Sequence, residues 1–110
     1  MDSEALIYGL KPGVIDRMNA VFRRFPEVAQ VILYGSRAKG NFKRGSDMDL
    51  CLIGDALSVP TLLKIDTELD DLLLPYKIDL SIHHQIDNPE LLSHIERVGT
   101  CFYRRTKEQE

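Results

Sequence analysis

The chain has 110 residues, of which 14 are Lys or Arg and 17 are Asp or Glu, so its formal net charge is −3 at pH 7. This length is typical of one domain, and the acidic balance argues against bulk electrostatic binding of nucleic acid or of an anionic membrane surface. With 44% hydrophobic and 28% charged residues, the composition is that of a folded protein rather than a disordered one.

Hydrophobic periodicity predicts that helices and strands alternate along the chain. Helices are expected where apolar residues recur every three or four positions and a proline or glycine ends the pattern, at residues 14–25, 59–73 and 89–98. Strands are expected in short runs that are apolar throughout or that alternate, at residues 29–34, 47–53, 77–82 and 100–103, the last at a sheet edge. This order predicts a small α/β (α+β) domain over residues 1–110, with a core of about 12–104 and a mixed sheet whose helices pack on one face.

Segments that would place the chain in or across a membrane are not expected. No run approaches the roughly 20 apolar residues that span a bilayer, and the first residues lack the basic start and apolar stretch of a signal peptide. Cys51 and Cys101 fall in strand-like runs without the close spacing of zinc ligands, which favours reduced, unliganded cysteines. We therefore expect a cytoplasmic protein.

Three acidic residues begin or interrupt apolar strands. Residues two apart on a strand point to the same face, so Asp47 and Asp49 project together, and Asp79 is placed in the same way on the next strand. If the two strands are neighbours, all three carboxylates share one sheet face. Because carboxylates in such proximity repel, a cation is expected between them, and Mg²⁺ prefers oxygen ligands of this kind.

The segment before these acids has the residue types of a phosphate site. Gly35 allows the backbone to turn sharply after a strand, and Ser36 offers a hydroxyl and a backbone N–H to a phosphate oxygen. The basic residues of the same segment are Arg37, Lys39, Lys43 and Arg44, with no acid among them. Asn41 and Phe42 stand where a P-loop needs Lys and Ser or Thr, which excludes that motif.

Each of these signals has an ordinary structural explanation when taken alone. An Asp-x-Asp after Gly-Ser is often a capped turn, and a basic loop is usually a solvated surface. Their combined spacing favours a functional site: Gly35-Ser36, ten residues, Asp47-x-Asp49, then an acid on a later strand. The histidines are weaker candidates, because the adjacent His83 and His84 would point to opposite sides of a strand, and His94 receives no role.

The residues from Leu33 to Gly40, followed by Gly45-Ser46-Asp47-Met48-Asp49-Leu50, resemble the G-S-x10-D-x-D signature of the polymerase-β-like nucleotidyltransferases. Lys77-Ile78-Asp79-Leu80 matches the position of that family's third carboxylate. The short chain is similar to the minimal nucleotidyltransferases of bacteria and archaea, and the resemblance extends over about residues 14–103.

This resemblance implies transfer of a nucleoside monophosphate, AMP from ATP in our interpretation, to a hydroxyl acceptor with release of pyrophosphate. It implies that Asp47, Asp49 and Asp79 are catalytic and hold two Mg²⁺ ions, and that Gly35 and Ser36 bind the β- and γ-phosphates. It also suggests that Arg37, Lys39 or Lys43 neutralises the leaving pyrophosphate. Because the chain has no residues left for an acceptor-binding domain, the resemblance implies a separate acceptor, a tyrosine of a small helical HEPN-type toxin for which this chain is the antitoxin.

Two other functions stay open at this stage. The chain could neutralise its partner by binding alone, with nucleotide transfer incidental. It could also act on a small hydroxylated molecule, with the acceptor held in a groove of a homo-oligomer. The base preference, the acceptor and the oligomeric state do not follow from the spacing of the motifs.

Overall fold

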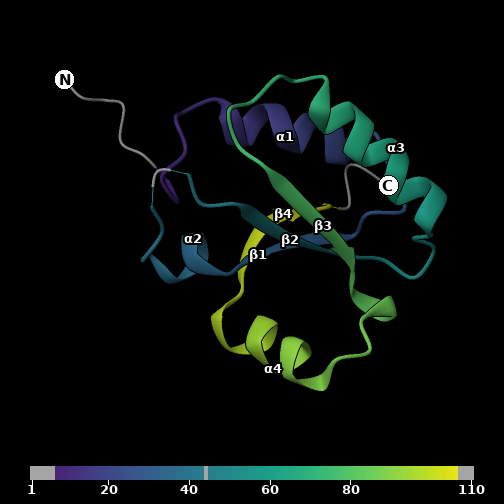
Figure 1. Cartoon of the computed structure of the whole chain (residues 1–110). Coiled ribbons are helices and arrows are strands. Elements are labelled where there is room, and N and C mark those ends of the chain that lie inside the picture. The colour runs from purple at the N-terminus through teal and green to yellow at the C-terminus, as the bar shows by residue number, and fades with distance from the viewer. Residues whose placement is uncertain (1–6, 44, 107–110) are drawn as a thin grey trace.

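The computed structural model describes residues 7–43 and 45–106 (Figure 1). Its elements in chain order are α1 (Val14–Arg23), β1 (Gln30–Tyr34), α2 (Ser36–Lys39), β2 (Met48–Ile53), α3 (Val59–Asp70), β3 (Ile78–Ile82), a 3₁₀ turn (His83–Gln85), α4 (Pro89–Val98) and β4 (Thr100–Arg104). Every helix and strand expected from the periodicity is present, with ends that differ by up to three residues.

The starts of α3 and α4 follow from capping residues in the sequence. The Ser58 hydroxyl accepts a hydrogen bond from the Thr61 amide at 3.5 Å, and the Asn88 side chain accepts one from the Glu90 amide at 2.9 Å. A proline stands in the first turn of each helix, where its missing N–H has no intrahelical partner to lose. The two helices therefore begin where local sequence chemistry predicts.

The described strands form a four-stranded sheet in the order β3-β2-β1-β4. β1 runs antiparallel to both β2 and β4, whereas β2 and β3 run parallel and are connected by way of α3. The mixed α/β sheet predicted from the sequence is confirmed, and β4 lies at an edge as expected. The parallel pair matters for function, because it brings the starts of β2 and β3 to the same end of the sheet.

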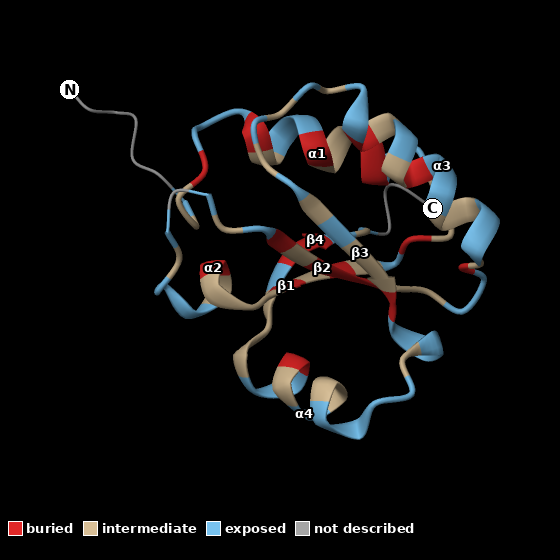
Figure 2. Cartoon of the chain, in the orientation of Figure 1, coloured by how far each residue is buried: buried red, intermediate tan, exposed pale blue. Residues whose placement is uncertain are grey.

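The hydrophobic core lies between the sheet and the pair α1 and α3. Alternate residues of the central strands are completely buried on this face, among them Val31, Leu33, Leu50 and Leu52. Figure 2 shows the buried residues gathered in the sheet and on the sides of α1 and α3 that face it. An ion pair between Arg24 and Glu68 joins the two helices at the surface.

α4 lies on the opposite face of the sheet, which corrects the expectation that all helices pack on one face (Figure 1). The side chain of Ile32 approaches Gly99 at the end of α4, and the Tyr34 ring contacts His94 within it. Ile32 and Tyr34 alternate with the buried Val31 and Leu33, so they point away from α1 and α3. The amphipathic pattern of α4 showed that one of its faces is buried, but not which face of the sheet it covers.

Among the described residues, no helix combines the length and the apolar character needed to cross a membrane.

Candidate active site

A close contact between two strands forms the centre of the site. Gly35 follows β1 with φ +83° and ψ −159°, a conformation accessible almost only to glycine. A β-carbon at this position would lie 2.3 Å from Oδ2 of Asp49. The glycine therefore serves two purposes here, since it turns the chain into α2 and leaves room for the carboxylate.

Three polar side chains lie in one row across the sheet. Asp49 on β2 is paired with Tyr34 on β1 and with Asp79 on β3. Paired residues on neighbouring strands point to the same face, so the phenol and the two carboxylates share the face that α4 partly covers. Asp47 stands one residue before β2 and is exposed, two positions from Asp49. The strands that carry Asp49 and Asp79 are neighbours, so the condition under which these carboxylates share a face is met.

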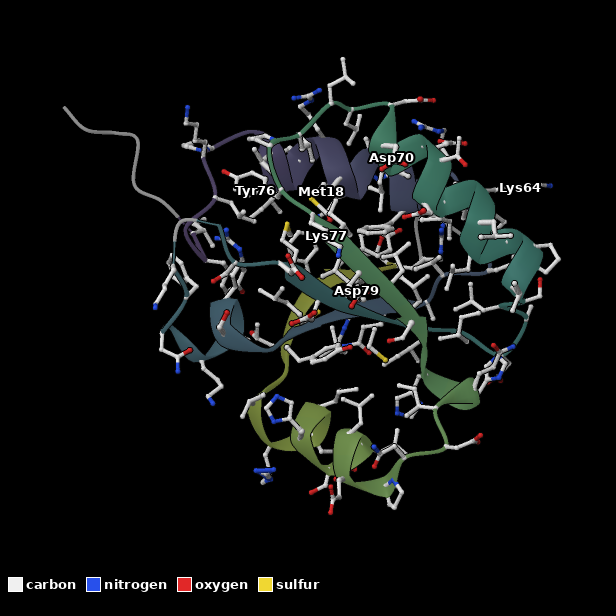
Figure 3. The ribbon with its side chains drawn as sticks, in the orientation of Figure 1. Met18, Lys64, Asp70, Tyr76, Lys77 and Asp79 are labelled. Atoms are coloured by element: carbon white, nitrogen blue, oxygen red, sulfur yellow. The ribbon has the colours of Figure 1, made fainter. Side chains whose placement is uncertain are left out.

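The electrostatics of Asp49 reflect this grouping of acids. Burial raises the pKa of its carboxyl group above 3.8, and the charges of Asp79 and Asp47 raise it further. The charge of His94 acts in the opposite direction on the pKa of Asp49. Figure 3 shows Asp79 on β3, with Tyr76 and Lys77 on the segment that leads into the strand. Of the three acids on this side of the sheet, Asp49 is thus the one whose ionisation is opposed by burial and by its acidic neighbours.

The turn into α2 presents backbone and hydroxyl groups beside these carboxylates. Ser36 begins α2 and is half-buried. The four-residue helix ends at Gly40, whose amide donates to the Ser36 carbonyl at 2.9 Å. The loop that follows is closed by a second turn, in which the amide of Lys43 donates to Oγ of Ser46 at 2.8 Å. Lys39 and Lys43 are exposed and face solvent, whereas Arg44 is outside the described residues.

Arg37 differs from the two lysines because its side chain is almost completely buried, at 2% exposure. Its guanidinium group donates to the carbonyl oxygens of Ser46 at 3.2 Å and of Tyr8 at 2.8 Å. The sequence suggested Arg37 as a ligand for the leaving pyrophosphate, but the buried position turns the side chain into the protein rather than toward solvent.

Two functional candidates were missed by the sequence analysis. The Tyr34 and His94 rings meet edge to face at 6.2 Å between centroids, with an interplanar angle of 83°. Burial raises the pKa of the Tyr34 phenol, while a hydrogen bond with Ser81 lowers it. Tyr34 could have been found from strand alternation, because it lies on the same face as the acids once β1 and β2 are paired. No signal in α4 indicates that His94 turns toward the sheet.

The remaining candidates are placed as the sequence predicts. His83 and His84 are exposed, although they lie in the 3₁₀ turn rather than on β3. Cys51 and Cys101 are free thiols, the first buried in β2 and the second exposed on β4.

The acidic face fits an open Mg²⁺ site rather than a closed one. In residues 7–43 and 45–106, no group of three or more His, Cys, Asp or Glu side chains is close enough to enclose a metal ion. Mg²⁺ is usually held by one or two carboxylates and completes its octahedron with substrate phosphates and water. The carboxylates of Asp49 and Asp79 share one face, and the charges of Asp79 and Asp47 raise the pKa of Asp49, so a cation that arrives with a nucleotide would relieve this repulsion.

A family model matches most of the chain. The model described as polymerase beta, nucleotidyltransferase, matches residues 16–108. The chain belongs to this nucleotidyltransferase family. The resemblance inferred from the motifs is therefore confirmed at the level of the family, and no match was found among curated proteins.

Solved structures of nucleotidyltransferase antitoxins have the same fold as this chain. A toxin–antitoxin complex with AMP-PNP is 18% identical, with a TM-score of 0.68 over 86% of this chain and 77% of the other. The MntA–HepT toxin–antitoxin complex is 15% identical, with a TM-score of 0.61 over 87% and 74%. A tri-AMPylated HEPN toxin with its MNT antitoxin, from Shewanella oneidensis, gives 15% identity and a TM-score of 0.62 over 86% and 73%. At these identities the likeness establishes the fold.

Proposed function

We propose that this nucleotidyltransferase transfers AMP from ATP to a tyrosine hydroxyl of a small helical HEPN-type protein, and that this modification makes it the antitoxin of that partner. The observation that carries the proposal is the pairing of Asp49 with Asp79 beside Gly35. It puts two carboxylates next to a turn whose backbone can approach a triphosphate closely.

The roles of the binding residues follow from their places in the site. Asp47, Asp49 and Asp79 would hold Mg²⁺, two ions in our proposal, and the bound metal would neutralise phosphate charge and orient the triphosphate. Gly35 and Ser36 would bind the β- and γ-phosphates at the start of α2. Lys39 and Lys43, both exposed near this turn, would neutralise the pyrophosphate as it leaves. Arg37 is not included, because its side chain is buried.

The proposed reaction is an in-line displacement at the α-phosphorus. The acceptor oxygen forms a bond to this phosphorus, the bond from phosphorus to the oxygen that bridges the α- and β-phosphates breaks, and pyrophosphate leaves. The hydroxyl proton would pass to the carboxylate of Asp79, which is exposed and therefore within reach of an acceptor from outside the domain. Asp49 is half-buried and would hold the metal that binds the nucleotide.

Two features of similar proteins support the choice of nucleotide and partner. One of the similar complexes contains AMP-PNP, an analogue of ATP, and another contains a HEPN toxin that carries AMP groups. The described part of this chain leaves Asp79 on an edge strand with its carboxylate exposed, which suits a protein acceptor. ATP, Mg²⁺ and such a partner occur together in the cytoplasm, where we place the protein.

Label transfer tests the proposal directly. The chain is co-expressed with a candidate HEPN-type protein, and the purified pair is incubated with Mg²⁺ and α-labelled ATP. We expect label on a partner tyrosine, and no label with Asp47→Asn and Asp49→Asn together. Asp55→Asn is the matched control, because Asp55 is an exposed acid beyond the far end of β2.

The same variants separate the competing functions. If the double variant still neutralises the partner in cells, then binding alone is sufficient and the proposed function is wrong. If label appears on a small hydroxylated compound without any protein partner, then the acceptor is wrong and the chemistry is right. Loss of both label and neutralisation in the double variant, with both retained in Asp55→Asn, supports the proposal.

A further inference from the structure

Arg37 is the one charged side chain that is buried in the described residues, at 2% exposure. It stands in the second position of α2, directly after the Gly35-Ser36 turn. A guanidinium group withdrawn from water in this way is stable only when hydrogen bonds and favourable contacts replace its hydration. Its contacts therefore show which parts of the fold depend on it.

The contacts of Arg37 join its own helix and the loop that follows it to two segments that are distant in sequence. Its Nε donates to the carbonyl of Ser46, and one of its terminal nitrogens donates to the carbonyl of Tyr8. The rings of Phe42 and Tyr76 lie 5.1 and 5.0 Å from the guanidinium carbon, within the range of cation–π attraction. The side chain thus connects α2 with the N-terminal turn, the loop at residues 40–46, and the segment before β3.

The packing around this side chain leaves little space. Gly9 has φ +75°, and a β-carbon there would lie 2.2 Å from the Phe42 ring and 2.8 Å from a terminal nitrogen of Arg37. The N-terminal turn is closed by two hydrogen bonds between Ile7 and Leu10. Because this turn, the Phe42 ring and the guanidinium group are in mutual contact, movement of any one of them affects the other two.

Two of the segments held by Arg37 lead directly into the acidic residues. Ser46 precedes Asp47, so the hydrogen bond to its carbonyl fixes the backbone one residue before that carboxylate. Tyr76 precedes Lys77, and the carbonyl oxygen of Lys77 accepts a hydrogen bond of 2.8 Å from the amide of Met48. Met48 stands between Asp47 and Asp49 in the sequence. The contacts of Arg37 therefore fix how the chain enters both β2 and β3.

We infer that Arg37 is a positioning residue for the nucleotide site, and that it aligns Asp47 with Asp49 and Asp79 from within the protein instead of binding phosphate. The inference rests on the proposed nucleotide chemistry. The planar guanidinium group donates to two separate carbonyls while its two faces contact two rings. Lysine cannot replace arginine here, because a single ammonium group lacks this planar geometry. Residues 40–43 and 45–46 would then lose their order without unfolding of the core.

The test compares Arg37→Lys with Arg105→Lys. Arg105 is a matched control because its guanidinium group also donates to backbone carbonyls, those of Val28 and Phe25, at the end of α1 and away from the acids. Amide hydrogen exchange of the metal-free protein reports on loop order, and Mn²⁺ binding in the presence of a non-hydrolysable ATP analogue reports on the carboxylates. Neither readout needs turnover.

For Arg37→Lys we expect amide exchange at residues 40–43 and 45–47 to accelerate about tenfold or more. We expect Mn²⁺–nucleotide affinity to fall by a factor of about 10–100, the range for residues that orient metal ligands. Arg105→Lys should lower the unfolding temperature and leave both readouts unchanged. If Arg37→Lys changes neither, or if both variants change them equally, the inference is wrong.

A second variant covers the case in which Arg37→Lys does not fold. Tyr76→Leu keeps an apolar side chain and removes one of the two ring contacts, so it should give the same loop exchange and affinity changes to a smaller extent. Unchanged loop exchange in Tyr76→Leu would also contradict the inference. A wild-type protein that binds no Mn²⁺–nucleotide would overturn the proposed function, whereas the exchange experiment would still decide whether Arg37 orders the loop.

Discussion

Asp49 and Asp79 lie directly opposite each other on the parallel strands β2 and β3. Their side chains share a face with no basic residue between them in this register, since Tyr34 completes the row on β1. The pairing is unfavourable for the protein alone, because the charge of Asp79 raises the pKa of Asp49 and so opposes its ionisation. It becomes favourable when a divalent cation, which can at the same time bind a triphosphate, lies between the two carboxylates.

This relationship predicts that Asp49→Asn stabilises the metal-free protein. The pKa of Asp49 is raised in the folded state, so its ionisation destabilises the fold. The penalty is absent below the unfolded pKa of 3.8, grows as the pH rises from there to the folded value, and is complete above it. At pH 7 with a chelator, the variant should unfold at a higher temperature than wild type, and the difference should vanish in acid. Thermal unfolding measured by circular dichroism checks this.

Mg²⁺ provides the control for that experiment. Addition of Mg²⁺ with an ATP analogue should raise the unfolding temperature of wild type and have much less effect on Asp49→Asn, because the ligand binds the folded state through that carboxylate. Lower stability of Asp49→Asn at pH 7 without metal would contradict the electrostatic interpretation. Asp79→Asn should also raise the unfolding temperature of the metal-free protein, because the charge of Asp79 raises the pKa of Asp49 more than that of Asp47 does.

Gly35→Ala should destabilise the protein and abolish label transfer. The substitution combines a strained backbone conformation with a β-carbon 2.3 Å from Oδ2 of Asp49, and strain of this kind costs about 1–3 kcal/mol. Gly40→Ala is the matched control, since Gly40 also has a positive φ, +85°, but has no atom within 4 Å of the added carbon. Chemical denaturation and the labelling assay should show a smaller stability loss and retained transfer in Gly40→Ala. Equal activity of the two variants would show that the contact with Asp49 is unimportant.

The two thiols should differ in their rate of alkylation. Cys51 is completely buried in β2, and burial raises the pKa of its thiol above 9.0, with a hydrogen bond from Ser81 acting in the opposite direction. Because the thiolate is the reactive form, Cys51 should be alkylated far more slowly than the exposed Cys101 at pH 8. Mass spectrometry of the native protein after treatment with iodoacetamide should show one modification at Cys101. Both thiols should react in denaturant, and equal rates in the native state would contradict the burial of Cys51.

Local chemistry explains which features of the fold could be predicted from the sequence. The caps Ser58 and Asn88 act on the adjacent turn, and strand alternation puts Asp47 and Asp49 on one face without reference to other segments. The pairing of Asp49 with Asp79 could be stated only as a condition, because it depends on which strands are neighbours. The structure satisfies that condition.

Long-range contacts explain what the sequence could not show. Arg37 lies in the same four-residue helix as the exposed Lys39, and it is buried because Tyr8 and Tyr76, distant in sequence, come together around it. α4 has a clear apolar side, but the sheet face that it covers depends on which face α1 and α3 already occupy. His94 was therefore assigned no role, although it contacts Tyr34.

The contact between His94 and Tyr34 gives the final prediction, which distinguishes packing from ligation. His94→Ala removes the edge-to-face contact and should lower the free energy of unfolding by about 1 kcal/mol, whereas His94→Phe keeps an aromatic ring and should restore it. The His94 charge lowers the pKa of Asp49, so its removal withdraws positive charge from beside the acids. His94→Phe should consequently bind Mn²⁺ with a nucleotide analogue at least as tightly as wild type. Loss of Mn²⁺ binding in His94→Phe, with wild-type stability, would instead identify His94 as a ligand.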